Sequence, residues 1–176
     1  MIDRIRLASI GLALATLILG SALPASGAAT FDVLEERVYG HWRAVLYRNV
    51  NGGRVFCAVE TDPIDAPMLR INRYRADGDT FLEIFDPAWN MMEGVVRFRF
   101  DVQVGMETIG VEFIGRSWGD SYTYDFLQVD IYEAVLQLLA TGSRLTVFNS
   151  NGTSIASYSL TGSAAAINAY RQCTTT

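Results

Sequence analysis

The chain has 176 residues, of which 19 are acidic and 14 are basic, and its formal net charge is −5 at pH 7. This length suits a single domain with a substantial core. The negative charge disfavours nucleic acid and anionic membrane surfaces as partners, because their phosphate groups would repel the protein.

The first 28 residues are typical of a secretory signal peptide. Arg4 and Arg6 precede an apolar stretch over 7–19, and Pro24 is followed by the small residues 25–28. A positive start, a short apolar core and a small-residue end are the three parts of such a leader. The apolar stretch is shorter than the roughly 20 residues of a membrane-spanning helix, which disfavours a retained anchor.

We expect cleavage after Ala28, with cleavage after Ala25 as the alternative. Removal of the leader leaves one β-rich domain over 29–176 with no membrane span. Every basic residue is Arg and none is Lys, and Ala and Gly are abundant, which suggests a GC-rich bacterial genome. We therefore predict a bacterial envelope protein that is periplasmic or secreted.

Short segments with β character follow in chain order. The clearest is 94–102, where Val96, Phe98 and Phe100 alternate with charged side chains, as in a half-buried strand. Asn51-Gly52 is a strong hairpin signal, because both residue types tolerate positive φ. The seven expected strands are His41–Val50, Arg54–Thr61, Met68–Arg75, Thr80–Phe85, Gly94–Val102, Ile109–Phe113 and Tyr122–Phe126.

The hydrophobic period changes after residue 129. Asp130 is positioned to cap a helix, with Glu133 as its capping-box partner three residues later. Apolar side chains then recur on one face until Gly142, which we expect to end the helix.

A hairpin and a short helix complete the chain. The hairpin over 145–160 turns at Asn151-Gly152, and the helix over 164–172 is expected to be capped by Ser163. This order predicts a mainly β fold: an antiparallel β-sandwich or barrel-like core with one internal helix and a short C-terminal helix.

Two cysteines, Cys57 and Cys173, remain after leader removal. Export takes them into an oxidising compartment, where a pair of cysteines usually forms a disulfide. The chain lacks the C-x-x-C spacing of catalytic dithiols. We therefore predict a structural bond between the C-terminus and an early strand.

The segment from Leu138 to Cys173 reads LLATGSRLTVFNSNGTSIASYSLTGSAAAINAYRQC. It resembles the bacterial invasion-associated locus B family of exported β-sandwich proteins, in which a Ser-Leu-x-Gly strand end leads into an Ala-rich helix. Trp42, followed by a strand and Cys57, is similar to the opening of that family. The resemblance implies a periplasmic or outer-envelope β protein without an established enzymatic activity, and it supplies no catalytic residues.

Few residues offer catalytic or metal chemistry. His41 is the only histidine and lacks the partners of a triad or metal site, so we expect a structural or incidental role. Two acidic clusters lie at turns and lack the spacing of a calcium loop, which favours solvated turn residues. We predict no cofactor and no metal site. The clusters are Glu60, Asp62 and Asp65, and Asp77 and Asp79.

Two expected loops carry aromatic and other apolar side chains. Trp89 and Met91 lie in the first, and Trp118, Tyr122 and Tyr124 lie in the second. Exposed aromatic rings beside Asp suit sugar stacking or anchoring of a protein partner. The alternative is that the rings fold back and close the ends of the core.

Three functional hypotheses follow. The first is a non-catalytic exported envelope protein that binds a protein or glycan partner through these aromatic side chains. The second is a hydrolase that uses paired carboxylates, whose separation a sequence does not reveal. The third is a periplasmic inhibitor or immunity-type module. The candidate carboxylates of the second hypothesis are Glu83, Glu93, Glu107 and Glu112.

Overall fold

The computed structural model describes residues 31–62 and 67–175, so the predicted leader lies outside the described residues. The ten strands of this part form one antiparallel sheet in the order β1-β2-β3-β4-β5-β8-β7-β6-β9-β10, with two helices packed on it. The mainly β, antiparallel prediction is confirmed. The elements are β1 (Phe31–Tyr39), β2 (Trp42–Asn49), β3 (Val55–Thr61), β4 (Met68–Tyr74), β5 (Thr80–Phe85), β6 (Met91–Val104), β7 (Glu107–Gly119), β8 (Ser121–Asp125), α1 (Val129–Thr141), β9 (Arg144–Asn149), β10 (Ser154–Ser159) and α2 (Ser163–Thr175).

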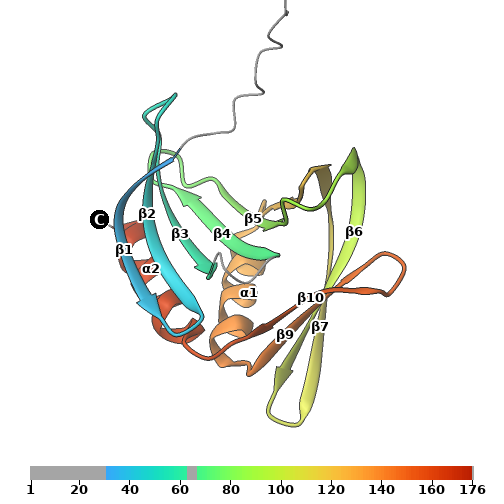
Figure 1. The fold of residues 1–176 in the computed structure, drawn as a ribbon. Coiled ribbons are helices and arrows are strands. Elements are labelled where there is room, and N and C mark those ends of the chain that lie inside the picture. Colours follow the sequence, from blue (N-terminus) through green and yellow to red (C-terminus); the bar gives the residue numbers. More distant parts are fainter. Residues whose placement is uncertain (1–30, 63–66, 176) are drawn as a thin grey trace, which may run out of the picture.

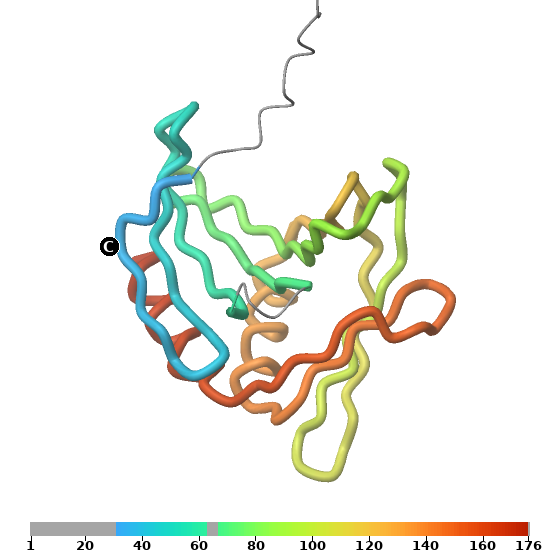
Figure 2. Tube along the Cα trace, in the orientation of Figure 1, coloured from blue at the N-terminus to red at the C-terminus, as the bar shows by residue number. Residues whose placement is uncertain are grey.

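The sheet bends strongly around the helices. In Figure 1, α1 lies near the centre, with β1 to β4 on one side and β6 and β7 on the other. The tube in Figure 2 shows β10 returning to the turn between β1 and β2. There the indole N–H of Trp42 donates a 2.8 Å hydrogen bond to the carbonyl oxygen of Ser159. The architecture is thus barrel-like and made from one continuous sheet.

The main core lies on the sheet face that carries the helices. Phe98, Phe100 and Val102 of β6 are buried there, as their alternation predicted. They pack in the same cluster as Leu136 and Leu139 of α1. Burial of these aromatic and aliphatic side chains is the main stabilising term of the fold.

A second, smaller cluster lies on the opposite face of β2 and β3. It consists of Val45, Tyr47, Phe56 and Ala58, so β3 is buried on both faces. The guanidinium carbon of Arg70 lies 6.0 Å from the Tyr47 ring centroid, although β4 and β2 are not adjacent in the sheet. The Arg70 side chain therefore extends across β3 to the smaller cluster.

The structure corrects two details of the predicted strand pattern. β1 was not predicted, so eight strands rather than seven precede α1. β6 and β7 also extend well beyond their predicted ends and pair from Met91–Gly119 to Val104–Glu107. The predicted hairpin turns are confirmed, and Gly53 and Gly152 adopt the positive φ values in them.

Both predicted helix caps are wrong. α1 begins after Gln128, so Asp130 lies in the first turn, where its negative charge interacts favourably with the helix dipole. The Ser163 hydroxyl lies 2.6 Å from the carbonyl oxygen of Leu139 and 2.7 Å from that of Leu160, so it donates towards α1 instead of capping α2. The predicted end of α1 at Gly142 is confirmed.

The predicted disulfide between Cys57 and Cys173 is confirmed, with a Cα–Cα distance of 6.0 Å. It joins β3 to the last turns of α2 across 116 positions of sequence. Such a bond is typical of a protein outside the reducing cytoplasm. Within 31–62 and 67–175, neither helix has the length and apolarity needed to cross a membrane.

Candidate functional site

The predicted aromatic contacts lie on two different faces of the sheet. Tyr122 and Tyr124 belong to β8 and point to the main core: the Tyr122 ring stacks 5.8 Å from Phe98, and the Tyr124 ring lies edge-on to Phe113 at 5.0 Å. Trp89 precedes β6, is half-buried and packs 5.3 Å from Tyr122. These three rings stabilise the inner face of the sheet.

The expectation of two aromatic loops is wrong for most of these residues. Met91 is the first residue of β6 and pairs with Gly119, while Trp118 lies near the end of β7. The Trp118 side chain points to the outer face of the sheet, away from the helices, and 70 % of the residue surface is exposed. Of the five predicted contact residues, it is the most exposed.

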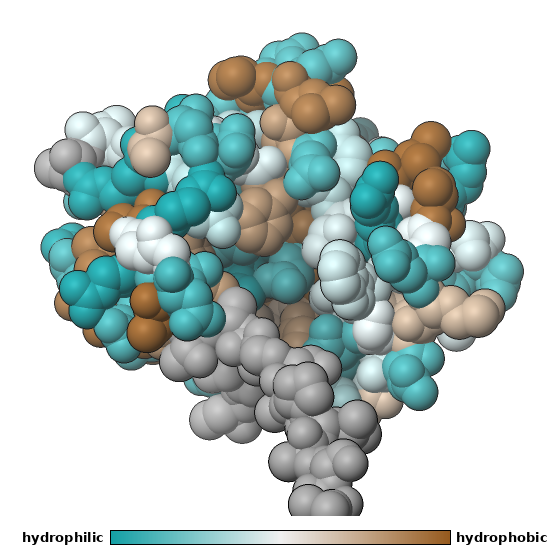
Figure 3. Space-filling model, turned by 90° about the horizontal axis from the view of Figure 1, so that it is seen from above, coloured by the Kyte–Doolittle hydropathy of each residue, from teal (hydrophilic) through white to brown (hydrophobic). Residues whose placement is uncertain are grey.

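Trp118 belongs to an apolar cluster on the outer face of the β6–β7 hairpin. Met92, Val95 and Ile114 are also exposed, at 90, 79 and 56 %. Trp118 lies opposite the register shift between Met91 and Gly94, beside Met92. Figure 3 shows hydrophobic side chains standing out on the same side of the molecule as β6 in Figure 1.

Two arginines complete this surface. Arg116 lies directly opposite Val95 in the β6–β7 pairing, and Arg97 lies opposite Ile114. Side chains at directly opposed positions are close neighbours, with Cβ atoms about 5 Å apart. We call the surface formed by Met92, Val95, Arg97, Ile114, Arg116 and Trp118 the outer patch.

The arginines of the outer patch have no carboxylate partner. Neither Arg97 nor Arg116 forms an ion pair or a side-chain hydrogen bond with any residue that the structure describes. By contrast, Arg99, two positions along the same strand, pairs with Asp101 at 2.9 Å. The patch therefore holds two guanidinium groups that no described carboxylate neutralises by an ion pair, with the exposed Glu93 carboxylate next to Met92.

A cavity of about 180 Å³ adjoins the outer patch at Arg97. Arg97, Arg99 and Phe148 line it, together with Glu112 and the turn residues 149, 150 and 152. The Arg99 guanidinium carbon lies 5.1 Å from the Phe148 ring centroid. The cavity thus combines an aromatic wall with cationic groups, which suits an acidic or amphipathic side chain.

A buried ion cluster lies on the same face of the sheet as the smaller apolar cluster. Glu60 is completely buried, and its carboxylate lies 2.5 Å from Arg43 and accepts a 2.8 Å hydrogen bond from the Tyr47 hydroxyl. Arg70 lies 3.8 Å from Glu60 and 2.5 Å from Glu83. Burial, and then the Glu60 charge, raise the pKa of Tyr47 far above its ordinary value, so this hydroxyl stays protonated.

This cluster contains two carboxylates, but they neutralise arginines. Arg70 lies between Glu60 and Glu83, and Glu60 has no surface open to a substrate. The other carboxylates considered for hydrolysis, Glu93, Glu107 and Glu112, are exposed on β6 and β7. Glu60 and Glu83 therefore neutralise the charges of Arg43 and Arg70, and they do not form an acid–base pair in an open cleft.

The remaining candidates are dispersed. His41 is exposed between β1 and β2, and Asp77 forms an ion pair with Arg54. Asp65 lies outside the described residues. Within 31–62 and 67–175, no three His, Cys, Asp or Glu side chains are grouped closely enough to hold a metal ion.

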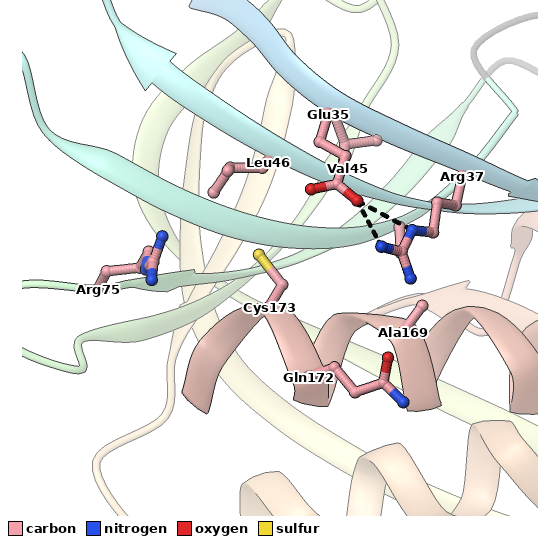
Figure 4. Close-up of a pocket in the computed structure, with 9 residues that line it drawn as sticks. Glu35, Arg37, Val45, Leu46, Arg75, Ala169, Gln172 and Cys173 are labelled. Atoms are coloured by element: carbon pink, nitrogen blue, oxygen red, sulfur yellow. Dashed lines mark hydrogen bonds and ion pairs between the residues drawn. The ribbon is translucent and has the colours of Figure 1, made fainter. Parts of the chain in front are cut away.

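A larger cavity of about 450 Å³ lies between α2 and the strands β1 and β2 (Figure 4). Leu46, Ala169 and Cys173 contribute to its lining, and Arg37 and Arg75 supply positive charge. Arg37 donates two hydrogen bonds to Glu35, at 2.9 and 2.6 Å, and these bonds raise the pKa of Arg37. Sequence analysis missed this cavity because its residues come from four separate segments.

The arginines of the outer patch were also missed, although the alternation over 94–102 had placed Arg97 on a charged outer face. Comparisons with known proteins give no further identification: no protein family matches the chain, and no similar protein of described function or solved structure was found.

Proposed function

We propose that this chain is a non-catalytic exported protein whose outer patch binds a protein partner with an acidic and partly apolar surface. The observation that carries the proposal is the pairing of exposed apolar side chains with two arginines that lack carboxylate partners. The disulfide and the leader sequence support a location in the periplasm or outside the cell. The resemblance to the invasion-associated locus B family supports a binding role over an enzymatic one.

The composition of the outer patch suits protein recognition. Trp, Met and Arg are enriched in protein interfaces, and Trp and Arg are prominent among the residues that dominate binding energy. The patch lies on two long paired strands, so little backbone conformational entropy is lost when a partner binds.

The positive charge defines the chemistry of the partner. Carboxylates would pair with Arg97 and Arg116, and an apolar side chain would cover Trp118 and Ile114. An Asp or Glu side chain of the partner would also fit the cavity beside Arg97. A glycan would use the Trp118 ring but would need neither arginine, unless it were acidic.

The test is a binding assay on the full protein, purified from a host that exports it. The probes are synthetic peptides that combine Glu with Leu and Phe, matched peptides in which Lys replaces Glu, and neutral oligosaccharides. We expect only the acidic peptides to bind, and we expect R97E/R116E and W118S each to weaken binding about tenfold or more.

The matched control is Arg144→Glu, because Arg144 is an exposed arginine on β9 outside the patch. It should leave binding unchanged apart from a small long-range charge effect. Equal binding of the acidic and basic peptides would overturn the proposal. So would oligosaccharide binding that depends on Trp118 alone.

A further inference from the structure

The cavity between α2 and the first two strands combines an apolar floor with a charged rim. Ala44 and Leu46 of β2 line it with side chains from the sheet, and Ala169 and Cys173 line it from α2. None of these side chains offers a strong hydrogen-bond donor. This part of the cavity therefore suits an apolar ligand body, and the Gln172 amide adds a polar group to the lining.

The two arginines of the cavity differ in whether a carboxylate neutralises them. Figure 4 shows them at opposite ends, with the Cys173 sulfur between them. Arg37 is neutralised by Glu35, whereas Arg75 forms no ion pair or side-chain hydrogen bond with a described residue. The Arg75 end therefore carries the net positive charge of the site.

We infer that this cavity binds a small amphiphilic carboxylate, with the carboxylate group on Arg75 and the aliphatic body along Leu46 and Ala169. A volume of about 450 Å³ lies within the range of small-molecule sites. A guanidinium binds a carboxylate through two parallel hydrogen bonds, which fixes the orientation of the ligand. The Glu35–Arg37 pair closes the far end and limits the length of the chain that fits. This site is separate from the outer patch and does not depend on the proposed function.

The probes are hexanoate, hexanol and hexylammonium, titrated against the full protein while amide chemical shifts are followed by NMR. We expect hexanoate to shift amides of β2 and of the C-terminal half of α2, and the other two probes to leave them unchanged. Arg75→Gln should weaken hexanoate binding about tenfold or more, since it removes a charged hydrogen-bond partner.

Two further variants make the outcome decisive. Arg144→Gln removes an exposed arginine outside the cavity and should bind hexanoate like the wild type. Ala169→Leu fills the cavity and should abolish binding while the spectra of this variant and of Arg75→Gln stay native outside the cavity. Equal shifts with hexanol and hexanoate, or equal affinity of the Arg75→Gln and Arg144→Gln variants, would overturn the inference.

Discussion

Removal of the disulfide should cost this protein a large part of its stability. The bond closes a loop of 116 positions between β3 and α2. In the chain-entropy treatment, a loop of this size restricts the unfolded state by about 16 cal/mol/K, or about 4–5 kcal/mol at 25 °C. Natural domains are stable by only about 5–15 kcal/mol, so the loss is a substantial fraction of the total.

The native structure should survive the change. α2 is also held by the hydrogen bond at 2.9 Å between the Tyr132 and Tyr170 hydroxyls, and by the Ser163 hydroxyl at the carbonyl oxygen of Leu139. We therefore expect the C57A/C173A variant to keep the circular dichroism spectrum of the wild type.

Urea unfolding measures the effect. The double variant should unfold at lower urea, with a free energy of unfolding lower by about 4–5 kcal/mol. Its m-value should rise, because the unfolded chain without the bond exposes more surface. The reduced wild-type protein is the control and should behave like the variant. A loss below about 2 kcal/mol would refute the reasoning, since it would mean that the bond does not restrict the unfolded chain as this treatment assumes.

Four further outcomes test the fold and the patch. Gly162→Ala should lower the free energy of unfolding in urea by about 2 kcal/mol or more, because φ is 95° and a Cβ would overlap the carbonyl oxygen of Tyr39; a loss below about 0.5 kcal/mol would contradict this. Glu60→Gln should cost about 1.5–3 kcal/mol in the same assay, because it removes the buried carboxylate that Arg43 and Arg70 share, while Glu36 and Glu83 still pair with these arginines. Burial raises the pKa of Tyr170 well above its ordinary value, so the contribution of this tyrosine to stability should be constant below about pH 10, and stability should fall above that pH as the unfolded tyrosines lose protons; spectrophotometric titration that ionises every tyrosine without unfolding would refute this. Trp118→Ser should change the free energy of unfolding by less than about 0.5 kcal/mol, since its ring is exposed.

The strands that bury one face were predictable from sequence, and the edge strand was not. In β6, inward Phe98 and Phe100 alternate with outward arginines, so the pattern has the period of a strand. In β1, residues 33–38 are all exposed and a register shift follows Val33, so no alternation develops. An edge strand is held mainly by backbone hydrogen bonds to one neighbouring strand, so its side chains need not follow the alternating pattern of a buried strand.

The faces of the aromatic residues depend on long-range pairing. Trp118 points outwards and Tyr122 inwards because β7 and β8 pair with a short turn between them, from Trp118–Ser121 to Arg116–Thr123. The side chains of a strand alternate between faces, so a shift of one residue would exchange the two rings. The sequence singles out Trp118 and Tyr122 as candidate contact residues, but only the strand register shows that the Trp118 ring is exposed and the Tyr122 ring is packed.

The helix caps failed for a related reason. Ser163 has the residue type of a cap, yet its hydroxyl contacts α1, which is distant in sequence. Gly162 is a similar case. Its positive φ and the close approach of β1 explain why the Ser-Leu-x-Gly segment ends in glycine. The residue that approaches is Tyr39, which is distant in sequence. Such tertiary contacts override local preference and cannot be read from neighbouring residues.

The distribution of arginine partners links both proposed sites. This chain has more acidic than basic residues, so a shortage of carboxylates does not explain an arginine without one. Among the arginines that the structure describes, seven pair with Asp or Glu, the Arg73 guanidinium carbon lies 5.8 Å from the Tyr132 ring centroid, and Arg144 donates to Ser157. The remaining three are Arg75 in the α2 cavity and Arg97 and Arg116 in the outer patch. Because these three arginines contribute no ion pair to the fold, their charges are available for a carboxylate from another molecule.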